Sequence, residues 1–179
     1  MIRSKHVFAA PVLLALALSG CGGNKKDEAV AGSYCPNPFL VQDAQSLTRF
    51  KPGTGRDPRD IAFQASITGT GVACEVSRKR LDVTLKIRVV ANAGPSVGAG
   101  TTSVPYFVRL LDASGGVADG QDFLADYKLS TANPRGASVE EITLVIPFNV
   151  PSDLGAYRVA VGLKPTPEEL DYNRRAVVR

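Results

Sequence analysis

The sequence predicts an all-β protein: an immunoglobulin-like β-sandwich of about seven strands, with an irregular N-terminal arm and a short C-terminal helix. Two observations support this prediction. From Ile61 onward, short segments of alternating apolar and polar residues are separated by Gly, Pro and Asn, with no helical pattern between them. The apolar content of 44% is sufficient for a packed core, and 179 residues suit one domain with a tail.

The first twenty residues have the features of a secretory signal peptide. Arg3 and Lys5 form a positive n-region, and the apolar stretch 7–18 follows it. A helix of that length is too short to cross a bilayer core of about 30 Å, so the segment is not predicted to span a membrane. It ends in Leu18-Ser19-Gly20-Cys21.

This last motif resembles the lipobox of bacterial lipoproteins in all four positions. The resemblance implies that 1–20 is a lipoprotein signal peptide, that cleavage occurs before Cys21, and that Cys21 carries the lipid. Because Gly22 rather than Asp follows Cys21, the resemblance further implies sorting to the outer membrane, with the protein lipid-anchored on the periplasmic face. The alternative is a simple secreted protein that is cleaved nearby.

Removal of the signal peptide would change the composition and exclude several functions. The chain's single His and single Met, His6 and Met1, would be lost, and the net charge would fall from +4 to +2. Without His, a His-dependent triad or a His metal site cannot form. A nearly neutral chain without a basic stripe of stacking aromatics does not indicate nucleic-acid binding. We therefore expect no enzymatic activity, no cofactor and no metal.

The segment after the lipid site is predicted to be unstructured. Residues 22–33 are small or charged and lack a periodic apolar face, so 21–33 is interpreted as a lipid-anchored flexible tether. The chain has three Cys. If the lipid occupies Cys21, the oxidising periplasm predicts a disulfide between Cys35 and Cys74. The alternatives are two free thiols or an intermolecular bridge.

Residues 34–59 form the predicted arm. Four prolines interrupt it, and between them Val41–Phe50 is predicted to form one short helix. Two interpretations remain open: a segment packed across the edge of the sheet, or a docking segment for a partner protein. In the second interpretation Arg49 supplies a charged contact. The apolar anchors would then be Phe39, Leu40, Leu47 and Phe50.

The predicted β-sandwich domain covers 60–179. Its clearest strand is Leu81–Val89, in which five apolar residues alternate with four polar ones. Ile61–Thr68 and Val72–Val76 are weaker strands on either side of a predicted turn at Gly69-Thr70-Gly71. The remaining predicted strands are Val104–Leu111, Phe123–Leu129, Val139–Val150 and Tyr157–Leu163.

Two local motifs refine the second half of the chain. The segment Asp153–Tyr157 resembles the D-x-G-x-Y motif that opens strand F of immunoglobulin domains, although Val159 replaces the usual Cys and the core Trp is absent. Near the C-terminus, Thr166 and Glu169 have the spacing of a capping box, which predicts a helix over Pro167–Arg175.

The charged pairs and runs are interpreted as solvated groups. Neighbouring carboxylates do not converge on a strand or a helix, so Glu140-Glu141 and Glu168-Glu169 are not predicted to form acid–base pairs. Arg78-Lys79-Arg80 is interpreted as a solvated hairpin turn, with a contact to anionic lipid or to a partner as the alternative.

The arm carries a second family resemblance. After the lipobox and tether, Cys35-Pro36, Asp43-Ala44 and the run 47–53 (Leu-Thr-Arg-Phe-Lys-Pro-Gly) resemble accessory lipoproteins of the outer-membrane β-barrel assembly (Bam) complex. The resemblance implies that the arm docks onto another lipoprotein subunit. The residues that it carries over are Leu47, Thr48, Arg49, Phe50 and Pro52.

The predicted function follows from these observations. We expect an outer-membrane-anchored periplasmic lipoprotein that acts as a non-enzymatic protein-interaction subunit in cell-envelope assembly. Its partners would be the membrane, through the lipid, and an envelope protein such as a subunit of the barrel-assembly complex. The alternative is a periplasmic carrier of a small ligand or lipid, with a pocket in the β-domain.

Overall fold

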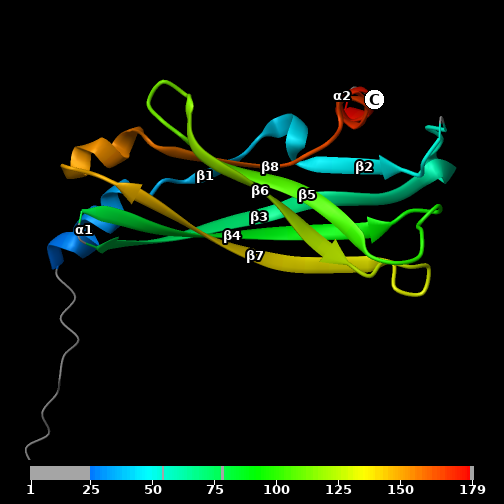
Figure 1. Cartoon of the computed structure of the whole chain (residues 1–179), viewed down its shortest axis with the longest axis horizontal. Coiled ribbons are helices and arrows are strands. Elements are labelled where there is room, and N and C mark those ends of the chain that lie inside the picture. Colours follow the sequence, from blue (N-terminus) through cyan, green and yellow to red (C-terminus); the bar gives the residue numbers. More distant parts are fainter. Residues whose placement is uncertain (1–24, 54, 78, 178–179) are drawn as a thin grey trace, which may run out of the picture.

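The computed structural model describes residues 25–53, 55–77 and 79–177. The predicted signal peptide and Cys21 lie outside these residues. The described chain forms two four-stranded sheets that share one hydrophobic core, so the predicted β-sandwich is confirmed (Figure 1). Within the described ranges, no helix is both long and apolar enough to cross a membrane.

Each sheet combines strands from distant parts of the chain. One sheet has the order β1-β8-β5-β6, formed by Pro38–Leu40, Arg158–Leu163, Thr102–Leu111 and Val117–Tyr127. The other has the order β2-β3-β4-β7, formed by Ser46–Phe50, Ile61–Ser77, Arg80–Ala93 and Arg135–Pro147. β1 pairs with β8 in parallel, and the other neighbours are antiparallel. The helical elements are α1 (Lys25–Tyr34), η1 (Gln42–Ala44), η2 (Pro58–Asp60), η3 (Pro151–Ala156) and α2 (Pro167–Val177).

The immunoglobulin-like connectivity is not confirmed. Constant-type immunoglobulin domains place their strands in the orders ABED and CFG. Here three consecutive strands, β2, β3 and β4, lie side by side in one sheet, and neither of those orders contains such a run. The described residues contain eight strands rather than about seven, because the arm supplies two strands and two predicted strands merge into one.

The core is built around β4, whose alternation was the clearest sequence signal. Leu81, Val83, Leu85, Ile87 and Val89 each have 0% exposure. They belong to the same apolar cluster as Val104, Val159, Val161 and Leu163 of the other sheet. Burial of each such side chain contributes roughly 1.5–3 kcal/mol. The predicted strand is therefore confirmed, and it extends to Arg80–Ala93.

The predicted turn at Gly69-Thr70-Gly71 is wrong. β3 runs through it as one strand, and its register against β4 shifts between Ile67 and Gly69. Ile67 lies opposite Val89 before the shift, and Val72 lies opposite Leu85 after it. The irregularity therefore returns apolar side chains to the core face, and glycine is often found at such positions.

The predicted helix over Val41–Phe50 is also wrong. Only the short turn η1 is helical there, and β2 follows, paired with β3. Pairing with an existing strand satisfies the backbone of β2 and buries Leu47 completely. These tertiary interactions outweigh a helical period that spans fewer than three turns.

Part of the predicted flexible tether is a helix. α1 begins at Lys25, and Ala31 in its second half is only 9% exposed. Val30 and Tyr34 pack against the core, and the Cys35 amide donates a hydrogen bond of 3.1 Å to the Ala31 carbonyl. The helix therefore depends on tertiary contacts, which composition does not reveal.

Candidate interaction site at the N-terminal arm

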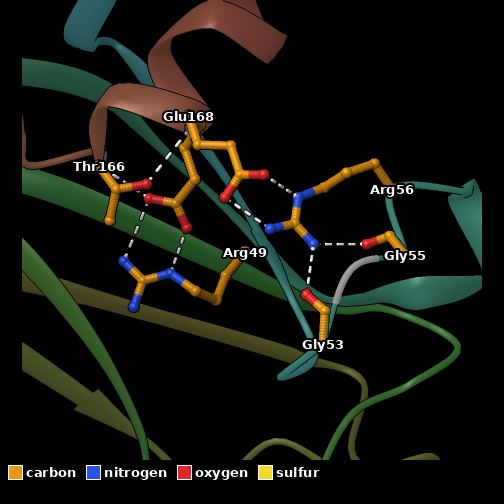
Figure 2. A network of polar contacts seen from close by, with 7 residues as sticks. Arg49, Gly53, Gly55, Arg56, Thr166 and Glu168 are labelled. Carbon is orange, nitrogen blue, oxygen red and sulfur yellow. Dashed lines mark hydrogen bonds and ion pairs between the residues drawn. The ribbon is translucent and has the colours of Figure 1, made fainter.

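The sequence motif of the arm lies in a surface groove where β2 ends and α2 begins. The groove encloses about 300 Å³. Figure 2 shows the polar contacts that cross it, between arm residues and the first turn of α2. Its lining residues are Arg49, Phe50, Lys51, Pro52, Gly53, Arg56, Thr166, Glu168 and Glu169.

The inner contact of the groove pairs Arg49 with Glu169. The Arg49 Nε donates to Glu169 Oε1, and its Nη2 donates to Oε2 over 3.3 Å. Glu169 is only 4% exposed, and its Oε2 also accepts from the Thr166 amide at 2.8 Å. The Glu169 amide in turn donates to Thr166 Oγ1 at 3.3 Å. The capping box is therefore confirmed, whereas the interpretation of Glu169 as a solvated charge is wrong.

The outer contact pairs Arg56 with Glu168. The Arg56 Nε and Nη2 donate to the two Glu168 oxygens at 2.7 and 2.5 Å, and its Nη1 donates to the carbonyls of Gly53 and Gly55. The Arg56 hydrogen bond lowers the pKa of Glu168 below its usual value. Because Glu168 remains 60% exposed, solvent weakens this pair.

The rest of α2 continues along the same edge. The Asn173 side chain donates to the Ser46 carbonyl of β2 at 2.7 Å, and Arg174 pairs with Asp43 at 2.9 Å. The rings of Phe50 and Tyr172 meet edge to face, 5.0 Å between centroids. α2 therefore covers the outer edge of β2, where unpaired backbone groups would otherwise face solvent.

A disulfide fixes the beginning of the arm. Cys35 is bonded to Cys74 of β3, and their Cα atoms are 5.7 Å apart. This confirms the predicted pairing and excludes the alternative of two free thiols in this structure. The arm is thus held at one end by a covalent bond and at the other by α2.

The seven residues predicted to bind a partner differ in their exposure to solvent. Leu47, Thr48 and Phe50 are buried at 0%, 5% and 9% exposure, and Arg49 is engaged by Glu169. Leu40 packs partly against the core. Phe39, at 41% exposure, and Pro52 face solvent. Partner binding remains a prediction for all seven, and the two exposed residues are the most accessible of them.

Sequence reasoning missed three residues of the groove. Arg56, Glu168 and Glu169 take part in ion pairs that join residues more than 110 positions apart. The capping-box spacing marked Glu169 as a helix-start residue but gave no indication of its Arg49 partner. Long-range pairing of this kind carries no signature in a single sequence.

The two carboxylates of the groove are both paired with arginine side chains. Both accept hydrogen bonds from guanidinium groups, and the lowered pKa of Glu168 keeps this group ionised near neutral pH. Among the described residues, no group of His, Cys, Asp and Glu could hold a metal ion. No family model, curated protein or solved structure matches this chain.

Proposed function

We propose that this chain is an outer-membrane-anchored periplasmic lipoprotein that acts as a non-enzymatic protein-interaction subunit in envelope assembly. The Cys35–Cys74 disulfide is the observation that carries the proposal. Disulfides persist in oxidising compartments such as the bacterial periplasm. Together with the lipobox at Cys21, the disulfide supports export followed by anchoring.

The length of the linker supports a role close to the membrane. α1 begins at Lys25, four positions after Cys21. Four residues reach at most about 14 Å when fully extended, so the domain would stay near the bilayer surface. Confinement to that surface raises the effective concentration of the domain for a partner anchored in the same membrane.

The burial of apolar side chains between the two sheets favours interaction over the alternative of a ligand carrier. The two sheets bury their apolar side chains against each other, and many of these side chains are fully excluded from solvent. A carrier would need an apolar cavity of several hundred cubic ångströms. The groove at the arm is lined mainly by charged side chains, together with Phe50 and Pro52.

The arm supplies the surface that the proposal assigns to a partner. Phe39 and Pro52 remain exposed on a segment held by a disulfide and by two ion pairs. A preformed segment loses little conformational entropy on binding, which favours affinity. The barrel-assembly complex is the proposed partner, through the resemblance of 47–53.

Co-purification from detergent-extracted membranes tests this function. The tagged wild-type chain is expected to recover at least one barrel-assembly subunit, and F39A with P52A is expected to reduce the recovery. V150A, which shortens an apolar residue that is 52% exposed and lies outside the arm and the strands, is the matched control. The C21A chain is expected to lose palmitate labelling and the membrane fraction. Recovery of the wild-type protein alone would contradict the proposed partner.

A further inference from the structure

One lateral edge of the sandwich is covered by a helix, and the opposite edge is not. α2 covers the edge at β2, where the Asn173 side chain bonds the Ser46 carbonyl. At the opposite side both sheets end in long strands, β6 and β7. Within the part of the chain that the structure describes, nothing pairs with the outer edge of either strand. Such an edge presents free backbone donors and acceptors.

A groove lies between these two open edges. It encloses about 220 Å³, and its lining residues are Asp119, Gly120, Gln121, Phe123, Thr143, Leu144 and Val145. Large apolar side chains are exposed on the same two strands. Leu124 of β6 is 62% exposed, and Val139 and Val145 of β7 are 60% and 51% exposed. The edges of β6 and β7 therefore combine unpaired backbone groups with exposed apolar side chains, and both could bind an extended segment.

The charge of the two edge strands is negative in a chain whose net charge is positive. β6 and β7 together contain the carboxylates of Asp119, Asp122, Asp126, Glu140 and Glu141, and one cation, Arg135. Asp122 is compensated by Arg109 and Lys164, and Glu141 is compensated by Lys86 at 3.5 Å. Among the described residues, Asp119, Asp126 and Glu140 have no ion-pair partner, although Glu140 accepts a hydrogen bond of 3.4 Å from the buried Tyr106 hydroxyl. The edge therefore complements a basic ligand.

A second copy of the chain fits this edge poorly. Glu141 is the middle residue of β7. Centred antiparallel pairing of two β7 strands would place the two Glu141 residues opposite each other, with the Glu140 residues nearby. Like charges directly opposite in a strand pair are destabilising. The occupant that the charge favours is thus a different chain.

We propose that the β7 edge binds an extended, basic segment of a partner protein as an added β-strand. Main-chain hydrogen bonds to β7 would supply affinity, and alternate side chains would supply specificity. One set would enter the groove beside Phe123 and Leu144, and the other would lie along Val139 and Val145. Lysine or arginine residues would meet Asp119. This inference deepens the proposed function, because it defines a second surface through which an interaction subunit would bind.

Synthetic peptides provide the test. The lipidated protein in a neutral detergent is titrated with a fluorescent peptide of about twelve alternating Lys and Val residues, long enough to cover β7. The same peptide with Glu in place of Lys is the control ligand. The Lys peptide is expected to bind at least about tenfold more tightly. Amide hydrogen exchange is expected to slow in 135–147 when the Lys peptide is bound.

Variants separate strand addition from general charge attraction. D119K combined with V145K is expected to weaken the Lys peptide at least about tenfold. D171K, a charge reversal at an exposed residue of α2, is expected to change the affinity less than about twofold. Equal affinity for both peptides, exchange protection elsewhere than β7, or a wild-type dimer that V145K dissolves would each overturn the proposal.

Peptide binding to the β7 edge and co-purification of an envelope partner can fail independently of each other. If wild-type protein recovers a barrel-assembly subunit but does not bind the Lys peptide, the interaction role stands and the β7 edge is wrong. If the peptide binds as expected and no envelope partner is recovered, the edge stands and the proposed partner is wrong.

Discussion

Removal of the Cys35–Cys74 disulfide is expected to destabilise the protein by an amount that the structure lets us calculate. The two residues are 39 positions apart. For a loop of this size the chain-entropy model gives about 13 cal/mol/K, which is about 4 kcal/mol at 25 °C. A domain of this kind has roughly 5–15 kcal/mol of total stability, so the C35A/C74A variant is expected to fold with a small margin.

Urea unfolding, monitored by circular dichroism, measures this loss. The wild-type and C35A/C74A proteins are compared under the same solution conditions, and reduced wild-type protein serves as a second reference. Because the bond also holds α1 beside β3, hydrogen exchange in 30–35 is expected to accelerate in the variant before global unfolding. A loss below about 1 kcal/mol, with unchanged exchange in that segment, would refute the reasoning.

Three further predictions concern the groove and the sheets. E169Q leaves Arg49 without its carboxylate partner and is expected to cost about 2 kcal/mol in urea unfolding, less than a fully buried pair because Arg49 is 34% exposed. G94A places a Cβ against the Ile61 carbonyl and is expected to cost about 1–3 kcal/mol. Lys164 and Arg109 lower the pKa of Asp122, and Arg56 lowers the pKa of Glu168. The stability that these pairs contribute is therefore present at neutral pH and is lost as the pH falls below about 4. Urea unfolding midpoints at several pH values would measure this loss.

Matched controls make these predictions specific. E168Q removes the exposed neighbour of Glu169 and is expected to cost less than E169Q, because solvent screens its pair. An added Cβ at Gly98 meets no atom within 4 Å, so G98A is expected to stay within about 0.5 kcal/mol of wild type. High salt is expected to reduce the acid-dependent loss. Equal effects of E168Q and E169Q, of G98A and G94A, or of low and high salt would contradict the corresponding explanation.

The strands with strict alternation could be predicted because one physical constraint determines them. In β4, each second residue must avoid water, and all five apolar residues from Leu81 to Val89 do so. The capping box at Thr166 is local in the same sense, because its hydrogen bonds join residues three positions apart. The Cys35–Cys74 bond could be predicted because the assignment of Cys21 to the lipid leaves two cysteines.

The arm could not be predicted, because distant residues determine its structure. Leu47 fits a helical period in the sequence, yet pairing with β3 makes its segment a strand. α1 forms where composition predicts a flexible tether, because Ala31 and Tyr34 reach the core. The Arg49–Glu169 pair spans 120 positions. Each error occurs where a tertiary contact outweighs a weak local preference.

Site-specific photo-crosslinking in living cells tests the central claim, that this chain is an anchored interaction subunit, most directly. A photoreactive residue is introduced at Phe39 or Pro52 of the arm, or at Val145 of the β7 edge, and at exposed Asp171 as the control. The account predicts discrete adducts with an envelope protein from the arm or edge positions, which disappear when C21A prevents anchoring, and none from position 171. Absence of adducts from all three arm and edge positions in a correctly anchored protein would contradict it.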